Sequence, residues 1–277
     1  MSTVADTQRS RPIAVGSDLQ RFWNLTWTLA VTDFKLRFYG STLGYLWTLV
    51  RPFLFFGVVY FVFTEIAGLD ANVENYGVYI LFALVLFGFF SESTSGCVRC
   101  LAVRESLLRK MRFPRMVIPL SVVMTAVLNL GGTLAAVVIF AIASGVYPTW
   151  SWLELIPLIG LVAAFATGLG LLLSSLFVRY RDVQPIWEVV AQMLFYISPI
   201  LYVTTLVPEE YRDYYLLNPL ALLMTEMRAA VVDPSAPHPW DIADGALLLI
   251  PLGLIFAALA LGWIVFSRQA PRIAEEL

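Results

Sequence analysis

Long apolar stretches recur along this chain and predict helices that cross a membrane. The expected spans lie at about 46–66, 76–98, 117–144, 153–178, 185–205 and 245–266. A run of about 20 apolar residues is long enough, as a helix, to cross the hydrocarbon core of a bilayer. The pattern therefore predicts an all-α integral membrane protein with six transmembrane helices. They form one domain over residues 18–277, after a disordered tail over residues 1–17.

The segment before the first span has a different pattern, with aromatic residues on one side of a helix and polar residues on the other. A capping box formed by Ser17 and Gln20 predicts that this helix begins at about residue 18, and the pattern continues to residue 38. Such an amphipathic helix lies in the membrane interface rather than across it. The residues expected to hold it there are Trp23, Trp27, Phe34, Lys35 and Arg37.

Residues 206–244 are too polar to cross a membrane and too apolar for an ordinary loop. Pro208 is suited to open one short helix, and the pair Asn218-Pro219 to open a second. Pro199, near the end of the fifth expected span, should kink or break that helix. We expect two short re-entrant or surface helices, because backbone inside a bilayer must be hydrogen-bonded or line a cavity.

The charges fix the orientation that we expect. The chain has 18 Lys and Arg residues, and only Arg212 and Arg228 fall in segments that this topology places outside. Eleven of the 20 Asp and Glu residues fall outside. Because Lys and Arg close to a span are retained in the cytoplasm, both termini should be cytoplasmic and residues 206–244 should face the outer side.

The most basic stretch, residues 99–115, lies between the second and third expected spans and reads RCLAVRESLLRKMRFPR. A helix over 101–112, stopped by Pro114, has leucines on one side and most of its charges on the other. Two interpretations stay open at this point. The loop is either an anchor that only fixes topology, or a docking helix that offers an apolar ridge and charges to a soluble partner.

The chemistry of the chain argues against an enzyme. It is 59% hydrophobic and 14% charged, where a soluble protein has about 25% charged residues. It has no phosphate-binding loop, no zinc-protease motif and no nucleophile elbow. Its one histidine cannot form a metal cluster, and the pair Cys97 and Cys100 suits packing better than redox work. We expect no catalytic site, no metal and no cofactor in this chain. If this protein moves something uphill, the energy should arrive from outside the chain.

The ionisable residues expected to be buried number about three, namely Arg51, Glu92 and Glu188. A charge exposed to lipid is expensive, so each carboxylate should face protein or an aqueous interior.

Five motifs, in this order and spacing, resemble the membrane subunit of the ABC-2-type polysaccharide exporters, which handle lipid-linked O-antigen, teichoic acid, capsule and mycobacterial galactan. The motifs are DFKLRFYGSTLGYLWTLVRP (33–52), the basic helix before Phe113-Pro114, RYRDV (179–183), SPILY (198–202) and NPL (218–220). The resemblance covers about residues 18–266. It implies a homodimer in the bacterial inner membrane, with two cytoplasmic ATPase subunits that bind ATP and Mg. The partners would also include membrane lipids and the lipid-linked glycan, and no nucleic acid.

The resemblance also implies roles for particular residues. The basic helix corresponds to the segment that contacts the ATPase, and its expected contacts are Arg104, Glu105, Leu107, Leu108, Arg109, Lys110, Met111 and Arg112. The segment before the last span corresponds to gate helices at the outer mouth, with Pro199, Tyr211, Tyr214, Asn218 and Pro219 as gate residues.

An export pathway for a glycan gives the aromatic residues a use, because the faces of aromatic rings suit sugar C–H groups. The candidates are Phe55, Phe56, Tyr60, Phe89, Phe90, Phe195 and Tyr196, with Glu92 and Glu188 as polar members of the pathway. Lipid-facing packing is the alternative for each of them. For the whole chain, two other functions stay open: a small-molecule or drug exporter of the ABC-2 type, and a membrane enzyme acting on polyprenyl-phosphate sugars.

Overall fold

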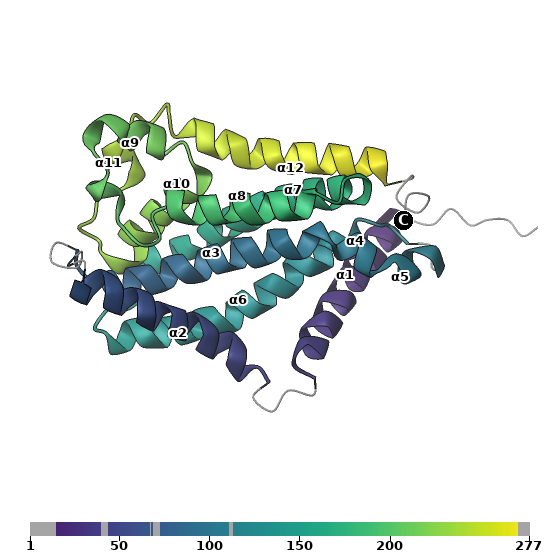
Figure 1. Ribbon diagram of the computed structural model, residues 1–277, viewed down its shortest axis with the longest axis horizontal. Helices are drawn as coiled ribbons and strands as arrows, with labels where there is room; N and C mark the ends of the chain where they lie inside the picture. Colours follow the sequence, from purple (N-terminus) through teal and green to yellow (C-terminus); the bar gives the residue numbers. More distant parts are fainter. Residues whose placement is uncertain (1–14, 40–43, 67, 69–72, 111–112, 271–277) are drawn as a thin grey trace, which may run out of the picture.

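The computed structural model describes residues 15–39, 44–66, 68, 73–110 and 113–270, and the secondary structure of this part is helical, without strands. Figure 1 shows long helices side by side, with short helices at both ends of the bundle. The elements are α1 (Val15–Phe38), α2 (Leu46–Phe61), η1 (Val62–Ile66), α3 (Tyr76–Val98), α4 (Cys100–Val103), α5 (Glu105–Lys110), α6 (Val117–Ala143), η3 (Trp150–Glu154), α7 (Leu155–Arg179), α8 (Val183–Ile197), η4 (Thr204–Leu206), α9 (Glu209–Tyr215), α10 (Pro219–Met227), η5 (Arg228–Val232), α11 (Pro239–Ile242) and α12 (Leu249–Gln269).

Five helical segments of the described part are long and apolar enough to cross a membrane: Leu46–Ile66, Tyr76–Val98, Val117–Ala143, Trp150–Arg179 and Leu249–Gln269. They coincide closely with five of the expected spans. The remaining one, α8, has 15 residues and ends at Ile197 rather than at about residue 205. At about 1.5 Å per residue it is shorter than a bilayer core of about 30 Å. Pro199 explains this end, because the chain before a proline avoids the helical conformation.

Helix α3 forms the centre of the bundle. In its most apolar window 78% of the residues are buried, against 11% for the segment that contains α2. It lies against α2, α6, α7 and α8. A helix that is apolar all round has no lipid-facing or water-facing side to prefer, so it takes the interior position. Helix α2, at the edge, exposes most of its surface.

Helix α1 runs across the ends of the long helices (Figure 1) and packs against α6. Thr26 and Ala30 are buried, and the hydroxyl of Thr125 donates a hydrogen bond of 3.2 Å to the carbonyl of Ala30. Trp23 and Trp27 are about half exposed on the other side. The helix begins at Val15, so the Ser17 capping box does not mark its start as we expected.

The other end of the bundle is covered by the segment that follows α8. Helices α9 and α10 begin directly after Pro208 and Asn218, as the sequence predicts. The side chain of Asn218 accepts a hydrogen bond from the backbone N–H of Leu220 at 3.0 Å, which caps α10. The apolar residues of α10 are buried. Their burial explains why residues 219–227 are more apolar than an ordinary surface loop.

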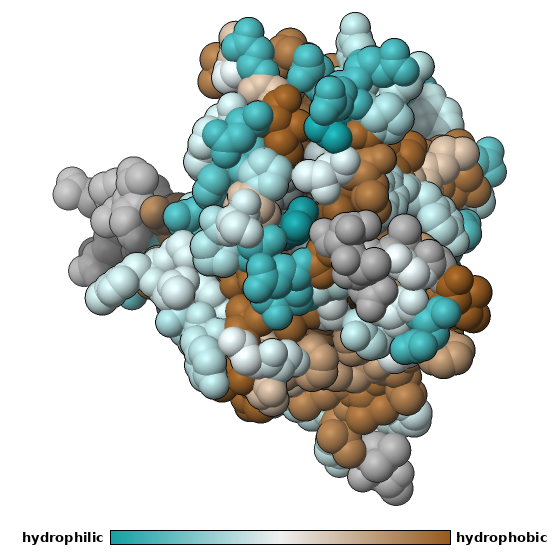
Figure 2. All heavy atoms as spheres, turned by 90° about the vertical axis from the view of Figure 1, so that its left-hand side faces the viewer, coloured by the Kyte–Doolittle hydropathy of each residue, from teal (hydrophilic) through white to brown (hydrophobic). Residues whose placement is uncertain are grey.

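Figure 2 looks onto this end of the molecule. Hydrophilic side chains cover much of it, most clearly at the top, where α9 and α11 lie. This end therefore suits contact with water rather than with the hydrocarbon of a bilayer.

Candidate functional site

The basic segment between α3 and α6 is folded differently from the expectation. It is two short helices, α4 and α5, with a break at Arg104, rather than one helix over 101–112. The guanidinium of Arg104 turns inward, where it pairs with Asp33 of α1 and donates a hydrogen bond of 2.9 Å to the hydroxyl of Ser121. Met111 and Arg112 lie outside the described residues.

Leu108 corrects a second expectation. We expected an apolar ridge offered to a partner, but Leu108 is buried in a cluster of this chain's own apolar side chains, formed with Cys100, Leu101, Ile118, Leu171, Val178 and Phe266. These side chains come from α4, α6, α7 and α12, and they cover the face of α5 that the pattern left apolar. Leu107 is only partly buried. Among the described residues of this segment, Val103 is the apolar side chain that is exposed, at 74%.

The remaining charges of α5 lie at the surface of the chain. Arg109 pairs with Glu105 one turn away at 2.8 Å, and both side chains are largely in solvent. Lys110 is exposed as well. With Val103, these residues form what we call the docking face: Val103, Glu105, Arg109 and Lys110.

The two cysteines behave as packing residues in this structure. Cys97 and Cys100 are both buried and make no disulfide. Burial raises the pKa of the Cys100 thiol to about 12, so it stays protonated at neutral pH. Within the described part of the chain, no group of His, Cys, Asp and Glu residues is arranged to hold a metal ion.

Helix α1 is attached to the bundle by two ion pairs from one of its faces. Asp33 and Arg37 are one helical turn apart; Asp33 pairs with Arg104 and Arg37 pairs with Glu92. The first pair joins α1 to the α4–α5 segment and the second joins it to α3. The two pairs therefore attach α1 to two other elements of the bundle.

The two carboxylates predicted to avoid lipid have different surroundings. Glu92 accepts a hydrogen bond of 2.6 Å from the amide of Asn129 on α6, in addition to its pair with Arg37, so it faces protein as we expected. Glu188 is exposed on α8 and accepts a hydrogen bond of 2.9 Å from Gln184. No part of the chain that the structure describes encloses Glu188.

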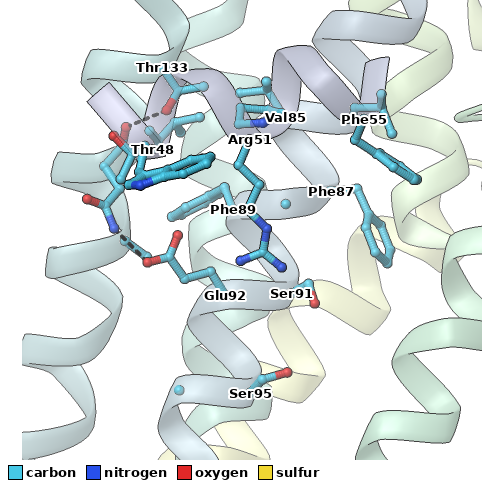
Figure 3. A pocket seen from close by; sticks show the side chains of 18 of the residues that line it. Thr48, Arg51, Phe55, Val85, Phe87, Phe89, Ser91, Glu92, Ser95 and Thr133 are labelled. Atoms are coloured by element: carbon cyan, nitrogen blue, oxygen red, sulfur yellow. Dashed lines mark hydrogen bonds between the residues drawn. The ribbon is translucent and has the colours of Figure 1, made fainter. Parts of the chain in front are cut away.

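A cavity of about 1560 Å³ lies beneath α2. Its walls come from α1, α2, α3 and α6, with Phe195 of α8 at one edge, and Figure 3 shows it from close by. Its polar lining includes Arg37, Thr48, Arg51, Ser91, Glu92, Ser95 and Asn129. Sequence reasoning missed Thr48 and Asn129, although an Asn within an apolar span was a usable signal.

The predicted pathway aromatics divide into three groups. Phe55, Phe89 and Phe195 line the cavity. Phe56 and Phe90 are core residues, packed against Phe140 and Phe165 with ring centroids 5.4 Å apart in each case. Tyr60 and Tyr196 are exposed and do not line it. The structure thus does not bring the seven residues together.

The predicted gate residues divide in a similar way. The single hydroxyl proton of Tyr79, on α3, is shared between the carbonyls of Pro199 and Tyr202 in a bifurcated hydrogen bond. The amide of Asn218 donates to the hydroxyl of Ser198 at 3.1 Å, so the Pro199 turn and the start of α10 form one packed unit, which includes the buried Pro219. The side chains of the other two gate residues, Tyr211 and Tyr214, are exposed on α9.

Acidic groups on and around α10 and η5 are partly or fully buried. Burial raises the pKa of Glu226, and the neighbouring Glu154 raises it further, while His238 at 3.2 Å acts in the opposite direction. Arg228 and Asp233 form a buried ion pair at 3.3 Å. These groups join α10 and η5 to the loops around them.

The long apolar helices, the amphipathic α1 at one end and the water-facing cap at the other define a polytopic α-helical membrane protein. The chain belongs to the ABC-2 type transporter family, which matches residues 24–232. The resemblance found in the motifs is therefore confirmed.

Several curated proteins are similar to the chain along most of its length. It is 30% identical to the O-antigen export system permease protein RfbA of Myxococcus xanthus, over 94% of this chain and 98% of the relative. It is 29% identical to an RfbA of Klebsiella pneumoniae, over 88% of this chain and 92% of the relative. It is 24% identical to the polysialic acid transport protein KpsM of Escherichia coli, over 84% and 90%.

Proposed function

We propose that this chain is the permease subunit of an ATP-driven exporter that moves lipid-linked polysaccharide from the cytoplasmic to the outer side of a membrane. One observation carries the proposal: the similarity to O-antigen export permeases extends over nearly the whole of both chains. The glycan is of the O-antigen, teichoic acid or galactan type. The chain supplies the path, and ATP and Mg are bound by a partner.

The proposed assembly is a homodimer with two cytoplasmic ATPases, in a bacterial inner membrane. Helix α8 supports the dimer, because it exposes Ile186, Val189 and Met193 together with Glu188. A carboxylate on such a face is expensive in lipid. A second copy facing α8 across an aqueous path gives Glu188 water and covers the apolar residues.

The ATPase contact in this proposal is the docking face. Arg109 and Lys110 supply charge there, and Val103 supplies an exposed apolar side chain. Buried apolar anchors dominate most protein contacts, whereas charges at the rim contribute less. The pair of Arg104 with Asp33 then transmits the movement to α1.

The orientation can be tested by cysteine labelling from each side. The substitutions Trp150→Cys and Tyr39→Cys place a thiol at residues that are 89% and 88% exposed, before α7 and after α1. A membrane-impermeant reagent added outside intact cells should label the first and spare the second. The buried Cys97 and Cys100 should not react in either case. The reverse labelling would contradict cytoplasmic termini.

The function can be tested with the purified complex in liposomes. ATP should drive a radiolabelled lipid-linked glycan to the opposite leaflet, and an ATPase partner without its catalytic lysine should not support transport. Movement of small dyes without the glycan would favour the drug-exporter alternative. Turnover of a polyprenyl-phosphate sugar by this chain alone, without ATP, would favour the enzyme.

A further inference from the structure

The cavity beneath α2 contains a charge that the rest of the fold does not balance. Four charged residues line it: Asp33, Arg37, Arg51 and Glu92. Asp33 is paired with Arg104, and Arg37 with Glu92. Arg51 has no carboxylate partner among the residues that the structure describes. An arginine cannot give up its proton to lower the cost of this position, so it requires an anion or water.

Arg51 lies inside a membrane span, where an unpaired charge is costly. It lies five residues after the first residue of α2, or roughly 7.5 Å into the membrane span. Its side chain extends into the cavity, and in the view of Figure 3 its guanidinium lies between the carboxylate of Glu92 and the hydroxyl of Ser91. A charged side chain within a span marks a functional site by default. The guanidinium presents donors in a fork that matches the oxygens of a phosphate.

The lining changes from polar to apolar along the cavity, and it does so on two helices. On α2, Thr48 and Arg51 are followed outward by Phe55 and Val58. On α3, which runs in the opposite direction, the polar residues around Glu92 occupy the inner end. Both helices therefore place polar groups near the inner face of the membrane and apolar groups deeper. A lipid of the inner leaflet has the same arrangement, with its headgroup at the surface and its chain in the interior.

We propose that this cavity binds the phosphate group of an inner-leaflet lipid, with Arg51 as the anion-binding residue and the Phe55 end as the site for the hydrocarbon chain. The volume of about 1560 Å³ exceeds the roughly 300–1000 Å³ of typical small-molecule pockets, and it suits an amphiphile of lipid size. A polyprenyl phosphate and an ordinary phospholipid both present this chemistry. Assigning the site to the carrier of the exported glycan rests on the proposed function.

The site can be tested by equilibrium binding to the purified complex in detergent. The probes are a radiolabelled polyprenyl monophosphate, phosphatidylglycerol, the phosphate-free polyprenol and inorganic phosphate. Arg51→Gln should weaken binding of the lipid phosphates about tenfold, because a charge-assisted hydrogen bond is lost, and Arg51→Lys should retain most of it. Arg268→Gln is the matched control, since this exposed arginine at the inner end of α12 does not line the cavity.

Tighter Arg51-dependent binding of the polyprenyl phosphate supports the site and assigns it to the glycan carrier. Tighter binding of phosphatidylglycerol supports the site and assigns it to bulk phospholipid. Equal binding by Arg51→Gln and Arg268→Gln would overturn the proposal, as would polyprenol or inorganic phosphate binding as tightly as the lipid phosphates. These measurements use neither ATP nor glycan, so their result is separate from that of the transport assay.

Discussion

In the orientation proposed above, the outer and inner ends of this bundle are held together by contacts that differ in burial. At the outer end, neutral groups join α3 and η3 to the segment after α8, beside the buried ion pair of Arg228 with Asp233. Tyr79 donates to two backbone carbonyls, Ser151 donates to the carbonyl of Ala230 at 2.6 Å, and the indole of Trp152 donates to that of Val231 at 3.1 Å. The helix that they surround, α10, is buried on all sides.

At the inner end, charged side chains that are partly in solvent join α1 to the bundle. The side chains of Arg37 and Glu92 are 47% and 33% exposed, and those of Arg104 and Asp33 are 18% and 29% exposed. The open cavity lies beside them.

This difference indicates which end is the easier to rearrange. A buried polar group left without its partner costs about 1–3 kcal/mol, so the outer end must move as a unit or not at all. A partly solvated ion pair exchanges its partner for water at a cost of about 1 kcal/mol or less. If a cytoplasmic ATPase drives the movement, as proposed above, we expect the movement to enter at the end that is the less costly to open.

We expect the largest effect at Leu108, in the buried apolar cluster of the inner end. Leu108→Asp places a charge in a buried apolar cluster and should lower the free energy of unfolding by about 3 kcal/mol or more. Val103→Asp, at the exposed last residue of α4, should change it by less than about 0.5 kcal/mol. Denaturation in mixed detergent micelles measures both.

The same two variants separate folding from docking. If the docking face binds the ATPase, Val103→Asp should release the ATPase on co-purification while the permease stays intact. A stable Leu108→Asp protein that has lost only its ATPase would contradict the burial of Leu108 and restore the exposed ridge expected from the sequence.

The next effect concerns the outer end. Tyr79→Phe removes a hydroxyl that serves two carbonyls and should lower the free energy of unfolding by about 1–3 kcal/mol. Tyr147→Phe, at a tyrosine that is 68% exposed near the same end, is the control and should have little effect. Equal stability of the two variants would show that the outer end is not held by its neutral hydrogen bonds.

The sequence predicts much of this fold because the length of an apolar run is a local property. Five spans have nearly the expected bounds, and Pro208 and Asn218 open helices where their chemistry requires. The break at Arg104 is not local. It accompanies a pairing with Asp33, 71 residues away, and nothing in the basic segment itself signals that partner.

The candidate site was harder to predict, for the same reason. The same rule, that a charge avoids lipid, applies to Glu92 and to Glu188. Asn129 and Arg37 surround Glu92, whereas nothing in the described chain encloses Glu188. Likewise, the amphipathic pattern of residues 101–112 shows that one side is apolar, but not whether this chain or a partner covers it. Packing supplies that answer.

A smaller effect sharpens the comparison of the ion pairs. A double-mutant cycle with Asp33→Asn and Arg104→Gln should give a coupling energy of about 1 kcal/mol, because neither side chain is more than 29% exposed. The matched cycle at the outer end, Glu209→Gln with Arg212→Gln, should give about 0.3 kcal/mol, because Glu209 is 88% exposed. A larger coupling at the outer pair would contradict the assignment of ionic attachment to the inner end.

The smallest effect that we expect is that of Arg109→Ala on the isolated permease. Arg109 and Glu105 form an exposed pair one helical turn apart, which contributes only about 0.3–0.5 kcal/mol and weakens with salt. Stability in detergent should therefore hardly change. In the complex, loss of this charge from the docking face should weaken ATPase binding at low salt and matter less at high salt. Co-purification over a salt series measures this, with Arg268→Ala at the inner end of α12 as the control. Identical salt curves for the two variants would remove Arg109 from the docking face and leave Val103 as its remaining anchor.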